Sequence, residues 1–152
     1  MRQSLRVIEG GDDPVFDDQG VGAMVASAVD LEVRLMGKKV LVIDDEKDVV
    51  TYLKTFLQKN HYEVLVAFDG DEGLKAAEKE QPDLITLDIM MPKETGVRFY
   101  RKIKQEETLK KVPIIVISGM AGRHLAVPKP EAVFEKPVDM QKLLETIQKL
   151  IA

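Results

Sequence analysis

The chain has 152 residues, 45% of them hydrophobic and 32% charged, a composition that suits one globular domain with a sizeable core. It has no cysteine, which excludes disulfides and thiol chemistry, and no membrane-length apolar run or signal-peptide pattern, so we expect a cytoplasmic protein without membrane insertion. Residues 1–37 carry seven acidic and three basic residues, whereas residues 38–152 carry 19 of each, so no cluster of positive charge indicates nucleic-acid binding.

The acidic first segment differs in pattern from the rest of the chain. Residues 1–20 are rich in glycine and aspartate with scattered apolar residues, which is typical of a disordered or loosely attached segment. Over residues 21–36, apolar side chains recur at helical spacing and allow a short amphipathic helix. We therefore predict an N-terminal extension at residues 1–37 and a folded domain at residues 38–152.

The folded domain alternates short apolar runs with helical patterns. Helices are predicted after the first run, over Asp71–Gln81, from about Thr95, and at the C-terminus, where the apolar stripe is the clearest. The five runs predict buried parallel strands: Val40–Ile43, Tyr62–Phe68, Leu84–Leu87, Ile114–Ile117 and Ala132–Glu135. Strands that alternate with helices in this way predict a doubly wound, three-layer α/β domain.

One connection fits this scheme poorly. Between Ser118 and Lys136 a fourth helix should link two parallel strands, yet the segment contains two glycines and two prolines. These residues leave room for little more than one helical turn, around Arg123 to Ala126. We therefore expect a shortened or irregular fourth helix.

Polar side chains follow four of the predicted strands. Asp44 and Asp45 follow the first, Asp88 the third, Ser118 the fourth and Lys136 the fifth. Because the carboxyl ends of parallel strands meet at one edge, these groups should share a site. Clustered carboxylates call for a hard cation, and Mg²⁺ suits oxygen ligands of this kind. One carboxylate could then attack phosphorus to form an acyl phosphate, with the ammonium and hydroxyl groups stabilising the charge.

The same residues resemble the receiver domain of two-component response regulators, in its single-domain, chemotaxis-receiver-like form. The resemblance covers residues 38–152, and it implies a flavodoxin-like strand order 2-1-3-4-5. It rests jointly on four motifs: VLVIDDE at Val40–Glu46, DIMMPKETG at Asp88–Gly96, IIVISG at Ile114–Gly119 and FEKP at Phe134–Pro137.

The resemblance also implies a role for each site residue. Asp88 would be the phosphoacceptor and, with Asp45, a direct Mg²⁺ ligand. Asp44 would hold the ion through a water. The backbone carbonyl of Met90 would complete the metal ligands, and the phosphoryl group would be contacted by two further side chains, Ser118 and Lys136.

Two more positions are implied at the end of the domain. The peptide bond before Pro137 is commonly cis in the family. The position of the aromatic switch is occupied here by Val133, and the adjacent Phe134 should point to the other side of the strand.

The predicted function is that of a phosphoacceptor signalling receiver, phosphorylated by a histidine kinase or a histidine phosphotransfer protein. Its output would pass through contact with a downstream protein or through phosphorelay, and it would catalyse only its own phosphoryl transfer and dephosphorylation, not act as an enzyme. One alternative is a receiver-like binding module that is not phosphorylated; the valine at the switch position supports it a little, whereas the complete set of acceptor-site residues argues against it. A second, a haloacid-dehalogenase-like phosphatase, would need an aspartate two residues after the nucleophile, where Met90 and Lys47 stand instead.

Overall fold

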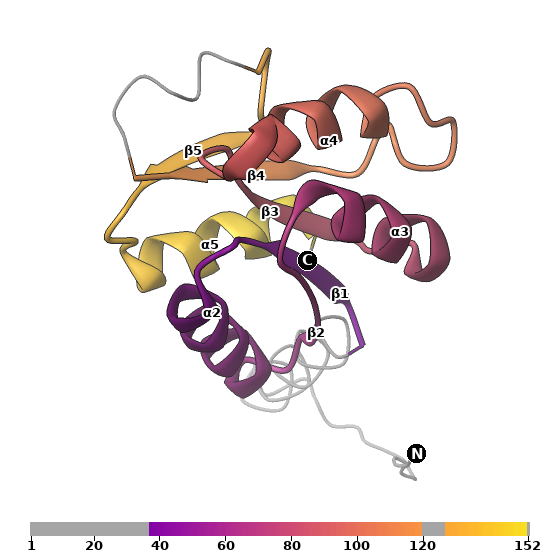
Figure 1. The fold of residues 1–152 in the computed structure, drawn as a ribbon. Coiled ribbons are helices and arrows are strands. Elements are labelled where there is room, and N and C mark those ends of the chain that lie inside the picture. The colour runs from indigo at the N-terminus through magenta and orange to yellow at the C-terminus, as the bar shows by residue number, and fades with distance from the viewer. Residues whose placement is uncertain (1–36, 120–126, 152) are drawn as a thin grey trace, which may run out of the picture. The chain divides into compact units, whose positions relative to one another are not determined.

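A computed structural model describes residues 37–119 and 127–151 of the chain. It contains a five-stranded sheet in which all neighbouring strands are parallel, in the order β2-β1-β3-β4-β5 (Figure 1). The strands are β1 (Lys39–Ile43), β2 (Glu63–Ala67), β3 (Leu84–Asp88), β4 (Ile114–Ser118) and β5 (Ala132–Glu135). The predicted fold class and strand order are confirmed.

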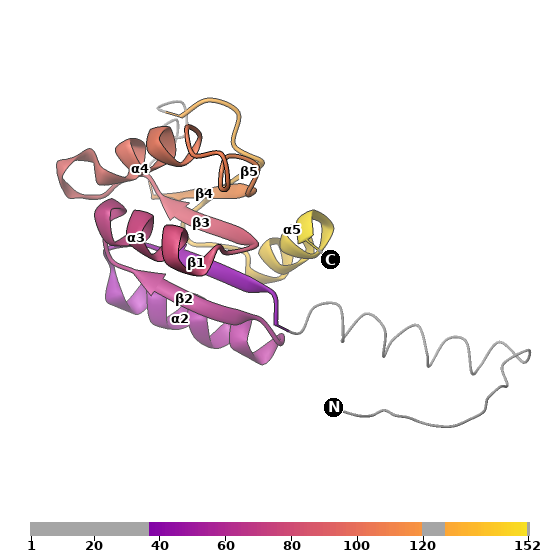
Figure 2. The same ribbon diagram turned by 90° about the vertical axis from the view of Figure 1, so that its right-hand side faces the viewer.

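Helices cover both faces of the sheet (Figures 1 and 2). On one face, α2 (Lys47–Lys59) and α5 (Met140–Ile151) pack against Val40 and Val42. On the other, α3 (Gly70–Glu80) and α4 (Thr95–Ile103) pack against Leu41 and Ile43. Successive residues of a strand point to opposite faces, so one apolar run supplies both halves of the core.

The bounds of α3 and the start of α4 lie within one residue of those predicted. The α3 helix begins one residue early because the Asp69 carboxylate accepts a hydrogen bond from the Glu72 amide at 2.8 Å and caps the helix. It ends at Glu80, the C-cap residue Gln81 adopts a left-handed backbone conformation, and Pro82 follows. The apolar stripe of α5 is buried at Met140, Leu143, Leu144 and Ile147 and half-buried at Ile151.

The chain returns to β5 through a segment that is anchored on its neighbours. The hydroxyl of Tyr100, on α4, donates a hydrogen bond to the carbonyl of Pro128. Glu131 pairs twice with Ile114: its carboxylate accepts from the Ile114 amide at 2.8 Å, and its own amide donates to the Ile114 carbonyl at 3.0 Å. These bonds set β5 against β4 and thereby place the residues that follow β5.

Two sequence predictions fall outside the described residues. The N-terminal extension at residues 1–37, with its helix over 21–36, lies there apart from Gly37, and the boundary at residue 38 stays a prediction. The single helical turn predicted around Arg123 to Ala126 lies there as well. On either side of it, Gly119 and residues 127–131 are non-helical. Within the described residues, no helix has the length and apolar character needed to cross a membrane.

Candidate functional site

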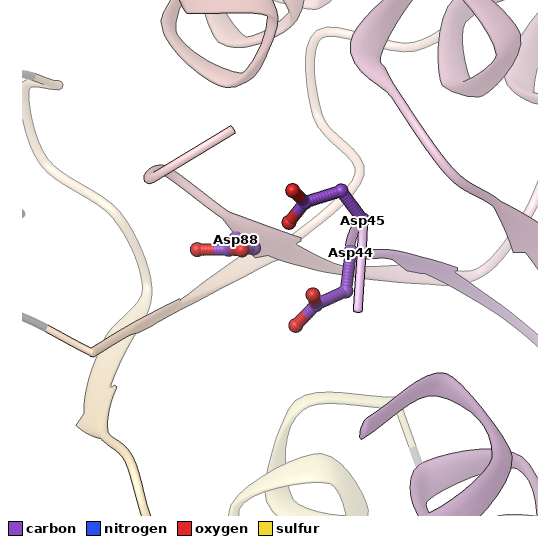
Figure 3. A group of neighbouring side chains, drawn as sticks. All are labelled: Asp44, Asp45 and Asp88. Atoms are coloured by element: carbon purple, nitrogen blue, oxygen red, sulfur yellow. The ribbon is translucent and has the colours of Figure 1, made fainter. Parts of the chain in front are cut away.

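Three carboxylates gather where β1 and β3 end. Asp44 and Asp45 directly follow β1, and Asp88 is the last residue of β3, which lies next to β1 in the sheet. Figure 3 shows the three side chains pointing into the same space beyond the strand ends. One oxygen from each carboxylate lies within 4.8 Å of the others. The sequence prediction that these aspartates come together is therefore met by the geometry.

Backbone amides orient the two buried carboxylates. Asp44 and Asp88 are each 2% exposed, whereas Asp45 is exposed to solvent. The amide of Glu46 donates to Asp44 Oδ1 at 2.8 Å, and the amide of Met90 donates to Asp88 Oδ1 at 2.9 Å. Each bond occupies one oxygen and leaves the second carboxylate oxygen to face the cluster.

Lys136 brings the positive charge to the cluster from the end of β5. Its ammonium nitrogen lies 2.7 Å from Glu46 Oε1, 2.9 Å from Asp44 Oδ2 and 3.6 Å from Asp88 Oδ2. The amide of Lys136 also donates to the carbonyl of Ser118 at 2.9 Å, which ties the end of β5 to the end of β4. The peptide bond between Lys136 and Pro137 is cis.

The electrostatic balance of the site is set by burial and by these contacts. Burial, followed by the charge of Asp44, raises the pKa of Asp88 to about 6, although the Met90 amide and Lys136 act in the opposite direction. Burial alone would lower the pKa of Lys136, but hydrogen bonds to Glu46 and Asp44 outweigh it and raise that pKa above its ordinary value. The cluster thus carries more negative charge than one ammonium neutralises.

The donor set fits a hard divalent cation. Carboxylate oxygens are the ligands that Mg²⁺ prefers, and Mg²⁺ commonly uses only one or two of them while keeping several waters. A hollow of about 420 Å³ opens beside the carboxylates and is lined by Asp45, Glu46, Asp88, Met90, Gly119 and Lys136. The hollow leaves space beside Asp45 and Asp88 for an ion together with its bound water molecules.

The loop from β3 to α4 is tightly constrained. Lys93 and Glu94, in the short 3-10 helix η2 (Pro92–Glu94) that ends this loop, both adopt left-handed conformations with φ of 60° and 53°. Gly96 follows, where an added Cβ would lie 2.6 Å from the carbonyl oxygen of Asp88. The start of α4 therefore packs directly on the peptide of Asp88.

The remaining predicted residues lie near the cluster or on the neighbouring strand. Ser118 is 1% exposed at the end of β4, and Met90 is 38% exposed on the rim of the hollow. Val133 pairs with Val116 and is 37% exposed. Phe134 instead packs on the face covered by α2 and α5, opposite to Val133, as the strand alternation predicted.

Sequence reasoning gave no role to Glu46, which the structure places in direct contact with Lys136. The available signal was its position as the residue before α2, where serine, threonine, aspartate or asparagine normally cap a helix. Glu46 makes no side-chain capping bond. Because the Glu46 carboxylate does not cap the helix, it is available to pair with a cation from another segment of the chain.

The protein is a doubly wound α/β domain with an acidic cluster at the carboxyl edge of its sheet. The profile of the response regulator receiver domain matches residues 40–148, and the chain belongs to this family of signalling modules.

Several relatives and solved structures resemble the chain. The alkaline phosphatase synthesis transcriptional regulatory protein PhoP of Bacillus subtilis is 43% identical over 84 residues, which cover 55% of this chain and 34% of PhoP. Response regulator PleD of Caulobacter vibrioides is 33% identical over 119 residues, 76% of this chain and 26% of PleD. The chain thus spans about a third or less of these two relatives.

Solved structures agree with the fold. The chemotaxis protein CheY4 of Vibrio cholerae superposes with a TM-score of 0.68 at 30% identity, over 75% of this chain and 98% of CheY4. The receiver domain of sensor histidine kinase PA1611 from Pseudomonas aeruginosa superposes with a TM-score of 0.69 at 25% identity, over 76% of this chain and 98% of that domain. The latter structure contains a magnesium ion coordinated in its active site cleft.

Proposed function

We propose that the protein is a phosphorylation-operated signalling receiver that accepts a phosphoryl group on Asp88. The observation that carries this proposal is the buried Asp88 carboxylate, which lies beside a second buried carboxylate, that of Asp44, with the ammonium of Lys136 near both. The phosphoryl donor would be the phosphohistidine of a histidine kinase or of a phosphotransfer protein, which places its action in the cytoplasm. Output would pass to a downstream protein by direct contact or by phosphorelay.

The transfer is an attack by one Asp88 oxygen on the phosphorus atom. A new O–P bond forms, the bond from phosphorus to the donor's ring nitrogen breaks, and its electron pair stays on that nitrogen. With a pKa of about 6, Asp88 is mostly ionised at neutral pH and is a competent nucleophile. The Met90 amide holds the Oδ1 oxygen at 2.9 Å, which leaves Oδ2 to attack.

Charge neutralisation supplies most of the catalysis in a transfer of this kind. Asp45 and Asp88, the backbone carbonyl of Met90 and, through a water, Asp44 would hold Mg²⁺, which screens the phosphoryl oxygens when it is bound. The Lys136 ammonium would donate hydrogen bonds to the same oxygens, and its raised pKa keeps it charged.

A hydroxyl contact would complete the phosphoryl site. Ser118 is buried at the end of β4, and its carbonyl is bonded to the Lys136 amide, so the two residues are held side by side. The Ser118 hydroxyl would donate to a phosphoryl oxygen. Val133 occupies the position of the aromatic switch. Residues other than Val133 would therefore have to couple the hydroxyl contact to an output surface.

The test is the intact mass of the protein after incubation with acetyl phosphate and Mg²⁺. Wild type should gain the mass of one phosphoryl group, and the gain should disappear with EDTA and in Asp88→Asn. Asp71→Asn is a matched control, because it removes an exposed aspartate that pairs with Arg98 on the surface. A folded wild type that gains no mass would contradict the proposal and favour a binding module that is not phosphorylated.

A further inference from the structure

The nearest partner of Lys136 is a residue outside the three clustered aspartates. Glu46 Oε1 lies 2.7 Å from the ammonium nitrogen, closer than Asp44 at 2.9 Å and much closer than Asp88 at 3.6 Å. The distance to Asp88 exceeds that of a charge-assisted hydrogen bond. In this state the ammonium is therefore bonded away from the proposed acceptor.

The two bonded partners of Lys136 differ in how easily they can release it. The Asp44 side chain is 3% exposed and would be left as a buried charge without its cation, which is strongly unfavourable. The Glu46 side chain is 59% exposed, and water can replace the ammonium around it at little cost. Glu46 is thus the partner that Lys136 can exchange.

Nothing in the local fold requires the Glu46 carboxylate to lie where it does. The residue is the N-cap of α2, yet its side chain makes no capping hydrogen bond. Its backbone amide, not its side chain, orients Asp44. The carboxylate can therefore be removed while both the helix start and the Asp44 contact are kept.

We infer that Glu46 is a positioning residue that holds the Lys136 ammonium at the rim of the site. The ammonium stays there until the oxygens of a phosphoryl group on Asp88 replace the Glu46 carboxylate as its hydrogen-bond partner. The inference rests on the proposed function. A phosphoryl group adds oxygens next to Asp88, and the Lys136 ammonium reaches them by leaving Glu46 and keeping Asp44. The ion pair with Glu46 opposes this movement, so it lowers the affinity of the site for a phosphoryl group.

The first experiment measures the binding of beryllofluoride, a phosphoryl mimic, in the presence of Mg²⁺ by calorimetry. Glu46→Gln keeps the size of the side chain and should bind about two- to fivefold more tightly, the ratio that corresponds to one exposed ion pair. Asp48→Asn removes another exposed carboxylate from the start of the same helix, and it should bind as wild type does.

The second experiment needs neither metal nor phosphoryl mimic. Nitrogen-15 NMR of the Lys136 ammonium in metal-free protein should show exchange of its protons with water at least about twofold faster in Glu46→Gln than in wild type or Asp48→Asn, because the neutral amide oxygen of glutamine accepts a weaker hydrogen bond than the Glu46 carboxylate. A purely structural role of Glu46 would change neither this rate nor the affinity.

The outcomes separate this inference from the function on which it rests. If wild type binds no beryllofluoride and takes up no phosphoryl group, both are overturned. If wild type binds but Glu46→Gln binds equally or more weakly, only the role of Glu46 is overturned. An equal gain in Asp48→Asn would show that any nearby negative charge weakens binding, and it would overturn the role of Glu46 as well.

Discussion

Neutralising Asp88 should stabilise the metal-free protein at neutral pH. Its pKa rises from 3.8 to about 6 in the fold, chiefly because of burial and of Asp44, so the folded state disfavours the ionised form. Each pKa unit corresponds to about 1.36 kcal/mol, and the shift of roughly two units limits the gain to about 3 kcal/mol. Asp88→Asn also removes the longest of the three Lys136 contacts, so we expect about 2–3 kcal/mol.

The pH dependence gives the sign of the effect. Between about pH 4 and pH 6 the folded state keeps a proton on Asp88 that the unfolded state has lost, so wild-type stability falls as the pH rises through this window. Above it the penalty is constant, and below about pH 4 it vanishes. Asp88→Asn should therefore exceed wild type in stability at pH 7 and equal it near pH 4.

Urea-induced unfolding in EDTA at both pH values measures this difference. The comparison of the two proteins at each pH cancels the titration of the other carboxylates. Addition of Mg²⁺ at pH 7 should stabilise wild type more than the variant, because a bound cation removes the charge penalty. An Asp88→Asn variant that is less stable than wild type at pH 7, or whose advantage is the same at pH 4, would refute the reasoning.

Two further predictions concern the packing around the site. Gly96→Ala should lose about 1–3 kcal/mol of stability and take up the phosphoryl group more slowly, because its Cβ would lie 2.6 Å from the backbone carbonyl oxygen of Asp88. The control is Gly119→Ala, whose Cβ would lie 3.8 Å from the nearest side-chain atom. Equal effects of the two substitutions would contradict the prediction. Tyr100→Phe should cost about 1 kcal/mol in urea unfolding, because the carbonyl of Pro128 loses its partner. Tyr52→Phe, at a side chain that is 61% exposed, should be neutral, and a neutral Tyr100→Phe would show that water replaces the bond.

The sequence was sufficient to predict the sheet and the gathering of the three aspartates. Apolar runs such as Leu84–Leu87 are long enough to be strands and too short to be helices, and the direction of parallel strands brings their ends together. The placement of Asp44, Asp45 and Asp88 at neighbouring strand ends follows from this topology alone. Their proximity can therefore be predicted without knowledge of the side-chain conformations.

Features that depend on side chains of distant segments could not be predicted in this way. The reach of Glu46 to Lys136 depends on rotamers and on the course of the chain after β5. The pairing of Glu131 with Ile114 uses a side chain in place of a backbone group, which no periodicity reveals. The left-handed conformations of Lys93 and Glu94 contradict the local preference of these residues, because the packing of α4 on β3 overrides it.

The distance in sequence between Lys136 and Glu46 has a consequence for folding during synthesis of the protein. The two residues are 90 positions apart, and Lys136 directly follows β5, the last strand in chain order of the described sheet. On the ribosome, β1 and β3 emerge well before β5, so the three aspartates can come together before Lys136 has been added to the chain. The three carboxylates then repel one another without the opposing charge of Lys136, and the arrival of Lys136 reduces this repulsion. The contribution of Lys136 thus waits for β5, which favours closure of the sheet as a late, cooperative step.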